Sequence, residues 1–261
     1  KKLSIAANLL LDAHNQKEDF KAIIKDGQWI LSNKAIKNKA LKRQISQIVQ
    51  QSEMKKVQVQ AGEFGTRSYA NNLLKLARKY KGSSLGDKAL YEAFVSFKTR
   101  KDPKAYESGE KLLLQHGKSK YAKEVVAEMG RMAIVSADFR RAALYFELYH
   151  EKYPRQADAN ELLKTAAQIR EQMGDFKIAA RDYQKLRDTR SAARMDYLAG
   201  DWSALLRSAP QAGGIHGHYW EGLAQYRLRG LGAAKKSLTK ASVSDVSGLE
   251  EKEMAAHALY L

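Results

Sequence analysis

The chain of 261 residues contains no cysteine and only three prolines. Without thiols it can form neither disulfide bonds nor cysteine-ligated metal sites. It also lacks any run of about 18 consecutive apolar residues, the length that a membrane-spanning helix needs. Long stretches in which β-branched and polar residues alternate are missing as well, which argues against a β-sheet protein. A helical fold is the class that fits these absences.

Residues 119–154 predict two helices joined by a tight turn, because apolar or small residues recur on one face of each. These residues are Val126, Met129, Gly130 and Ala133 on the first helix, and Phe139, Ala142, Phe146 and Tyr149 on the second. Asp138 stands where an N-cap is expected, and Pro154 ends the second helix. A hairpin of this kind cannot bury both of its faces alone, so we expect neighbouring copies.

Copies of the second helix recur along the chain. Each opens on a small or acidic residue followed by an aromatic residue, or by leucine in the last copy. The second member of each pair is Phe20, Phe64 (after Glu63), Tyr106, Phe139, Phe176, Trp202 or Leu231. Successive spacings of 44, 42, 33, 37, 26 and 29 residues indicate irregular repeats of a helical hairpin.

The central repeat resembles the signature of the tetratricopeptide (TPR) family: a Leu-Gly pair, an alanine, an aromatic residue, a second alanine and a closing proline. The matching residues are Met129-Gly130, Phe139, Ala142, Phe146 and Pro154. Two later units match through Gly174-Asp175-Phe176, Ala179 and Tyr183, and through Gly222, Leu231, Ala234, Leu238 and Ala241. Tyr149 departs from the signature, since it stands where the second alanine would be. Most units also lack the Leu-Gly pair, so a related helical-repeat family is the alternative.

The resemblance implies an all-α fold, a right-handed α-solenoid of about six and a half irregular TPR-like hairpins. We expect divergent, basic repeats over residues 1–60 and central TPR-like repeats over residues 61–190. Short and C-terminal repeats follow over residues 191–261, and the last of them is truncated. Residues 210–214 combine a proline with two glycines, so we expect them to interrupt the array.

The entry into the central hairpin, Lys118-Ser119-Lys120-Tyr121-Ala122, resembles the tandem repeats of bacterial cell-envelope proteins. In that group a Ser-x-Tyr-Ala step opens many units. It includes the periplasmic partner of the trans-envelope Tol system and the lipoprotein of the outer-membrane β-barrel assembly machine. The resemblance implies a periplasmic or envelope-associated protein, with the cytoplasm as the alternative. The sequence begins at Lys1, so a targeting segment removed before it stays an open question.

Positive charge is concentrated in the first half of the chain. Residues 1–120 hold 25 Lys and Arg against 11 Asp and Glu, whereas residues 121–261 hold 21 against 18. A field of one sign attracts an acidic protein, an anionic membrane or envelope polymer, or nucleic acid. The alternative is a solvated surface, because the lysines are interspersed and form no compact basic block.

The search for catalytic motifs finds little. Gly117-Lys118-Ser119 is similar to the end of a phosphate-binding loop, but Leu112 replaces its first glycine and a helix precedes it. His216 and His218 lie two residues apart without the further ligands that zinc needs. We therefore predict no catalytic residue, no metal and no cofactor, and a protein that is not an enzyme.

In a TPR array the first helix of each pair lines the groove in which partner segments bind. By matching positions, the resemblance implies this role for Tyr91, Phe94, Lys98, Glu128, Arg131, Val135, Lys164, Gln168, His216, Tyr219, Trp220, Leu223 and Arg227. The last five combine aromatic residues with arginine, the composition of binding hot spots. Two alignments of their unit compete, and in one of them Trp220 and Leu223 belong to the core.

The sequence thus predicts a non-catalytic protein–protein interaction scaffold that holds a partner segment in its groove, with an acidic partner favoured by the basic half. The envelope resemblance adds a role in assembling a bacterial cell-envelope complex. The alternative is a nucleic-acid-binding helical-repeat protein that uses the basic half. The identity of the partner and the oligomeric state are left open.

Overall fold

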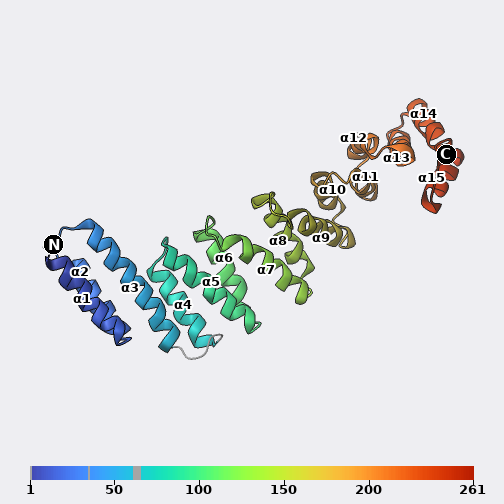
Figure 1. Cartoon of the computed structure of the whole chain (residues 1–261). Helices are drawn as coiled ribbons and strands as arrows, with labels where there is room; N and C mark the ends of the chain where they lie inside the picture. Colours follow the sequence, from blue (N-terminus) through green and yellow to red (C-terminus); the bar gives the residue numbers. More distant parts are fainter. Residues whose placement is uncertain (1, 35, 61–65) are drawn as a thin grey trace. The chain divides into compact units, whose positions relative to one another are not determined.

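The computed structural model describes residues 2–34, 36–60 and 66–261 (Figure 1). All regular secondary structure in these ranges is helical, in fifteen α-helices. They are α1 Lys2–Gln16, α2 Phe20–Ser32, α3 Lys39–Gln60, α4 Arg67–Lys79, α5 Ser84–Thr99, α6 Lys104–Gln115, α7 Ala122–Val135, α8 Phe139–Lys152, α9 Ala159–Gln172, α10 Phe176–Lys185, α11 Thr189–Leu198, α12 Trp202–Ala212, α13 Gly214–Arg227, α14 Leu231–Ser242 and α15 Leu249–Tyr260. The helix start predicted at Glu63-Phe64 lies outside the described residues.

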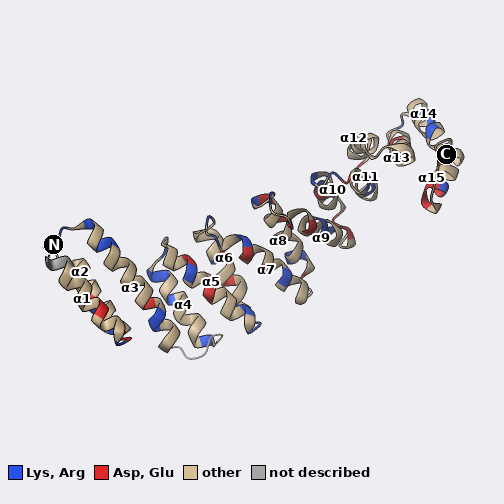
Figure 2. Cartoon of the chain, in the orientation of Figure 1, with Lys and Arg blue, Asp and Glu red and all other residues tan. Residues whose placement is uncertain are grey.

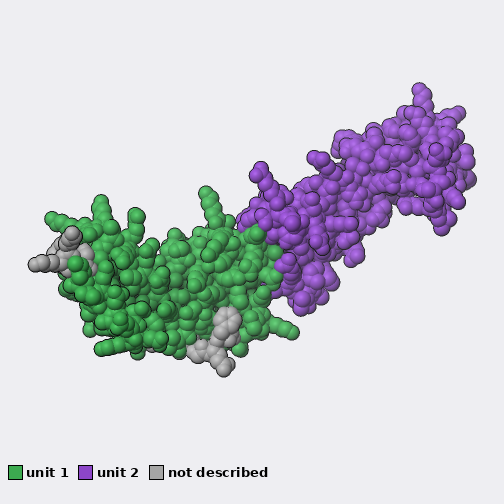
Figure 3. All heavy atoms as spheres, in the orientation of Figure 1, with its two compact units in different colours: residues 1–129 green, residues 130–261 purple. Residues whose placement is uncertain are grey.

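Consecutive helices of the described ranges pack as seven pairs, and α15 follows the last pair. The packing divides into two compact units, residues 1–129 and residues 130–261 (Figure 3). The prediction of an all-α array of helical hairpins is confirmed, with a number of hairpins close to the expected one. The division by repeat type at residues 60 and 190 stays a prediction.

Aspartates begin several helices directly after a tight turn. The Asp138 carboxylate accepts a hydrogen bond from the backbone N–H of Arg141 at 3.1 Å, and Asp201 caps α12 in the same way. Ala137, just before the first of these caps, has a φ angle of 56°, which reverses the chain after α7. These bonds satisfy backbone donors that a helix N-terminus leaves free. The N-cap predicted at Asp138 is confirmed.

Glycines allow the closest approaches between paired helices. A Cβ atom on Gly130 of α7 would lie 2.4 Å from the ring of Phe146 in α8. On Gly222 of α13 it would lie 2.7 Å from Leu238 in α14. Because real Cβ atoms do not approach so closely, any side chain at these positions would force the two helices apart. The two glycines of the TPR-like pattern therefore have a packing reason.

The expected interruption at residues 210–214 is wrong. Pro210 lies inside α12, which continues to Ala212, and α13 begins at Gly214 and packs against α12. A proline in a helix removes one backbone hydrogen bond, but Ala209 and Ala212 on the same turn are buried and hold the helix in place. Gly213 and Gly214 have positive φ angles and make the short turn between α12 and α13.

Candidate functional site

The second unit contains a pocket between alternate helices. In residues 130–261, α13 contacts both α11 and α15, so these first helices of successive pairs form one face. A pocket of about 410 Å³ opens on that face. It is lined by Arg194, Tyr197, Leu198, Tyr219, Trp220, Glu250, Glu253, Met254 and His257. We call it the α11–α15 pocket.

Three aromatic rings form the wall of the α11–α15 pocket. Tyr197 is 39% exposed, whereas Tyr219 and Trp220 are largely buried and anchored in the core of the unit. Behind Tyr197 lies Trp202 of α12, whose ring meets it edge-on with centroids 5.9 Å apart. The Arg227 guanidinium in turn lies 5.3 Å from the centroid of the Trp202 ring. The exposed tyrosine is therefore held by a packed neighbour.

A hydrogen bond joins two of the helices that line the pocket. The Tyr219 hydroxyl of α13 lies 2.5 Å from Nδ1 of His257 in α15. Burial, and to a smaller extent the neighbouring Tyr197, raises the pKa of Tyr219 above its usual range. The phenol therefore keeps its proton at neutral pH.

The mouth of the pocket is acidic. Glu250 and Glu253 are exposed and form no ion pair among the described residues, whereas the Arg194 guanidinium is bound by Glu171 at 2.5 Å. In Figure 2 the ribbon of α15 is coloured red at its acidic positions. Glu250 lies in the first turn of α15, where the helix dipole favours a negative charge. The pocket therefore presents two uncompensated carboxylates beside aromatic rings, in a chain whose formal charge is +17.

Helix α13 is buried on more than one side, which corrects the expected exposure of His216. His216 is only 6% exposed, and its Nε2 lies 3.4 Å from Glu251 Oε1. Trp220 and Leu223 are buried as well, as the alignment that placed them in the core requires. Both alignments assumed one open side for this helix, but α11, α12, α14 and α15 all contact it. Of the five residues expected to cluster there, Tyr219 and Trp220 line the pocket, and Arg227 alone is exposed.

Tyr91 and Lys98, two of the residues predicted in the first unit, are bound to other side chains of that unit. Tyr91 stacks on Tyr121 with ring centroids 4.3 Å apart and donates a hydrogen bond to Glu124 at 2.6 Å. Burial, and then the bond to Glu124, raises the pKa of Tyr91 to about 12. Lys98 Nζ lies 2.9 Å from Glu128 Oε2. Tyr91 and Lys98 on α5 thus meet acidic residues on α7.

Phe94 does not face solvent, and its expected place in a groove is wrong. Its side chain is 1% exposed and belongs to the core of the first unit. A Cβ atom on Gly109 of α6 would lie 3.3 Å from its ring, which shows how closely the paired helices meet there. The aromatic ring of a first helix can face either its partner helix or the groove, and here it faces the partner.

Arg131, Lys164 and Gln168 lie on exposed positions of α7 and α9 in the second unit. Val135, also expected in the groove, is 82% exposed. None of these four lines the α11–α15 pocket. A part for them in partner binding stays a prediction.

Seven of the nine lining residues of the pocket were absent from the sequence-based set. Four of them, Glu250, Glu253, Met254 and His257, recur at i, i+3, i+4 and i+7 on α15. Arg194, Tyr197 and Leu198 repeat the first part of that spacing on α11. This periodicity is visible in the sequence and marks one face of a helix. It mixes charged with aromatic residues, so a search for apolar faces passes over it.

The described ranges show neither a metal-binding cluster nor a membrane-spanning helix. They contain no group of three or more His, Asp or Glu side chains placed to hold a metal ion. His216 and His218 are two residues apart on α13, where such residues point in different directions. No helix of these ranges is long and apolar enough to cross a membrane.

Comparisons with known proteins find similar solved structures at low sequence identity. No protein-family model matches it, and no curated protein matches it in sequence. It is similar to the crystal structure of a tetratricopeptide repeat protein from Parabacteroides merdae ATCC 43184, with 10% identity and a TM-score of 0.36, over 99% of this chain and 100% of that one. It is also similar to yeast Tom70, with 13% identity and a TM-score of 0.36, over 99% of this chain and 58% of Tom70. This chain thus spans less than two thirds of Tom70, and the fold rests on its own helix pairs.

Proposed function

We propose that the chain is a non-catalytic protein–protein interaction scaffold whose α11–α15 pocket holds a segment of a partner protein. The observation that carries this proposal is the pocket itself, in which aromatic walls and unpaired carboxylates meet on the face formed by alternate helices. Partly exposed aromatic residues with a fixed conformation supply contact area at low entropic cost, as in known binding hot spots.

The chemistry of the pocket favours a cationic side chain of the partner. A lysine or arginine placed there would lie beside the partly exposed ring of Tyr197. Cation–π contacts contribute roughly 0.5–2 kcal/mol. Glu250 and Glu253 at the mouth would neutralise its charge. Because Arg194 is already bound by Glu171, it does not oppose a second cation as a free charge would.

The proposal extends to the assembly of a bacterial cell-envelope complex. Its support is the Ser119-x-Tyr121-Ala122 entry, which resembles the repeats of envelope proteins. The test is fractionation of source cells that express the full-length protein with an epitope tag. We expect the tag in the periplasmic or envelope fraction, and recovery with cytoplasmic markers alone would contradict this part of the proposal.

The binding proposal is tested with a display library of random short peptides selected on the purified chain. We expect selected peptides to be enriched in lysine or arginine. The double substitution Glu250→Gln/Glu253→Gln should weaken their binding about tenfold, since it removes both carboxylates. Tyr197→Ala should weaken it as well, and the fold should survive because the ring is partly exposed.

A matched control keeps the charge change and moves it elsewhere. Glu151 and Glu161 are exposed on α8 and α9 of the same unit, and Glu151→Gln/Glu161→Gln alters net charge equally. We expect this variant to bind the selected peptides like the original chain. Selection of acidic peptides, or equal loss in both double variants, would contradict the proposed role of the pocket.

A further inference from the structure

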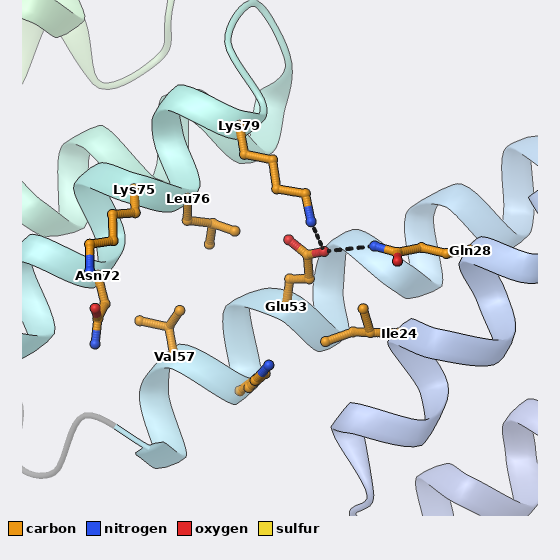
Figure 4. A pocket seen from close by; sticks show the side chains of 9 residues that line it. Ile24, Gln28, Glu53, Val57, Asn72, Lys75, Leu76 and Lys79 are labelled. Atoms are coloured by element: carbon orange, nitrogen blue, oxygen red, sulfur yellow. Dashed lines mark hydrogen bonds and ion pairs between the residues drawn. The ribbon is translucent and has the colours of Figure 1, made fainter.

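A second hollow lies in the unit of residues 1–129, between α2, α3 and α4 (Figure 4). Its volume is about 480 Å³. Its lining consists of Ile24, Gln28, Glu53, Lys56, Val57, Asn72, Lys75, Leu76 and Lys79. Because α4 packs more extensively against α5 than against α3, the space beside α3 stays open. We call it the α2–α4 cleft.

The walls of the α2–α4 cleft are basic. Of its three lysines, only Lys79 is paired, with Glu53 at 2.5 Å. Lys56 and Lys75 form no ion pair among the described residues. The cleft therefore presents two free ammonium groups, together with the amide of Asn72, to whatever enters it. In Figure 2 the ribbons of α3 and α4 are coloured blue at several basic positions.

Glu53 supplies the one carboxylate among the described residues that line the cleft, and its bonds connect the three helices. Glu53 of α3 is buried and binds Lys79 of α4. Its Oε1 also accepts a hydrogen bond at 3.4 Å from the amide of Gln28 in α2 (Figure 4). These bonds tie all three helices together and fix Lys79 at the edge of the cleft. Since its charge is matched by Lys79, Glu53 does not cancel the field of Lys56 and Lys75.

The basic surface continues along α4. A neighbouring hollow of about 290 Å³ between α4 and α6 shares Lys75 with the cleft. Arg78 and Lys104 also line it. Glu107, the one acidic residue among its described lining, is bound by Lys111 at 2.5 Å. Side chains on α4 can therefore contact more than one negative charge of an extended ligand.

The floor of the cleft is aliphatic. Ile24, Val57 and Leu76 form it, and neither hollow has an aromatic side chain among its described lining residues. Proteins that hold single-stranded nucleic acid usually stack its bases on aromatic rings. An aliphatic floor between lysines fits a peptide better, because an aliphatic side chain can be buried there while carboxylates on both sides of it reach the lysines.

We propose that the α2–α4 cleft binds an acidic peptide segment of a partner protein, with an aliphatic side chain on Ile24, Val57 and Leu76 and flanking carboxylates on Lys56 and Lys75. This site is separate from the α11–α15 pocket in both residues and preferred charge. Failure of either site in its test therefore leaves the other standing.

The test measures binding of three fluorescent probes to the purified chain. One is a glutamate-rich peptide with two leucines, the second replaces the leucines with serine, and the third is single-stranded DNA of equal charge. We expect the leucine peptide to bind most tightly. Lys56→Gln/Lys75→Gln should weaken it about tenfold, since two charge-assisted contacts are lost. Both lysines are partly or fully exposed, so the fold should be kept.

The control variant is Lys81→Gln/Lys118→Gln, which removes two exposed lysines of the same unit outside the cleft. We expect it to bind the leucine peptide within about twofold of the original chain. Glu250→Gln/Glu253→Gln should also leave this binding unchanged. Equal loss in the control, or equal binding of the serine peptide, would overturn the proposal. Tighter binding of DNA that depends on Lys56 and Lys75 would assign the cleft to nucleic acid and overturn it as well.

Discussion

The two units build opposite surfaces from the same kind of helix pair. Residues 1–129 hold 26 Lys and Arg against 13 Asp and Glu, whereas residues 130–261 hold 20 against 16. The hollow of the first unit has lysine walls and an aliphatic floor, and the pocket of the second has aromatic walls and a carboxylate mouth. The caps and close glycine contacts that set the fold leave the hollows free to differ. Repeat architecture therefore fixes where a binding surface can lie, and the side chains decide what it takes.

The largest expected difference between the two units concerns how much one ion pair in each contributes to the free energy of unfolding. Arg170 is buried and binds Glu147 at 2.7 Å and Asp175 at 3.0 Å. Arg170→Met leaves Glu147 without its partner and Asp175 with only the more distant Arg140, at 3.7 Å. We expect a loss of about 3 kcal/mol in the free energy of unfolding. Urea denaturation measures this loss.

The comparison pair in the first unit is Lys98 with Glu128, whose side chains are partly exposed. For Lys98→Met we expect a loss of under about 1 kcal/mol. If both substitutions destabilise the chain equally, burial does not separate the two pairs and this part of the comparison fails.

Glycine contacts test whether the units loosen separately. Gly222→Val would place a side chain against Leu238, and Gly27→Val would place one against Val49 of α3. We expect each to lower stability by about 2 kcal/mol, because the added methyl groups overpack the contact. Hydrogen exchange should rise in α13 and α14 for the first variant, and in α2 and α3 for the second. Loss of protection throughout both units in either variant would show a single cooperative body instead.

Reversing charge should make the second unit resemble the first. Glu250→Lys/Glu253→Lys places two cations at the mouth of the α11–α15 pocket. We expect lysine-rich peptides to bind about tenfold more weakly and acidic peptides to bind in their place. Fluorescence anisotropy with both peptides measures the change, with Glu151→Lys/Glu161→Lys as the control of equal charge. An unchanged preference would mean that the carboxylates do not set it.

The smallest expected effect is a pH dependence that differs between two aspartates of the second unit. Burial raises the pKa of Asp196, whereas the hydrogen bond from the Ala204 backbone N–H lowers the pKa of Asp201. A raised pKa favours the protonated form in the folded state. Asp196 therefore disfavours folding increasingly as the pH rises above the pKa that its carboxyl has in the unfolded chain. The effect of Asp201 has the opposite sign: its carboxylate stabilises the folded state, and this stabilisation is lost as the pH falls towards the lowered pKa.

The unfolding temperature of Asp196→Asn, taken relative to that of the original chain, should therefore be higher at pH 7 than at pH 3. For Asp201→Asn the relative unfolding temperature should be lower at pH 7 than at pH 3, although asparagine can still cap the helix. Thermal unfolding at the two pH values measures both. Shifts of the same sign would contradict the assigned causes.

Local signals in the sequence were sufficient for the fold. Asp138 was recognisable as an N-cap, and Gly130 and Gly222 stood where paired helices need room. The interruption predicted at Pro210 was wrong because a helix with buried alanines on both sides of a proline can continue through it. The fold could be predicted because caps and helix periodicity depend on neighbours in sequence.

The candidate site was predicted only in part, because it depends on which faces of a helix its neighbours cover. Tyr219 was expected in the groove and lines the pocket. His216 is buried because α13 is covered on more than one side, and Phe94 is buried because it faces its partner helix α6. The lysines of the α2–α4 cleft were counted in the basic half without being placed together. Their proximity depends on the packing of α4 against α5 and α3, which no local sequence pattern encodes.

The measurement that tests the central claim most directly is hydrogen-exchange footprinting of the chain with two peptides, one lysine-rich and one rich in glutamate and leucine. The account predicts that the first protects α11, α13 and α15 alone, and that the second protects α2, α3 and α4 alone. Both peptides should bind at once without competing. Footprints that coincide, or competition for one surface, would contradict the view that the two units carry separate sites of opposite preference.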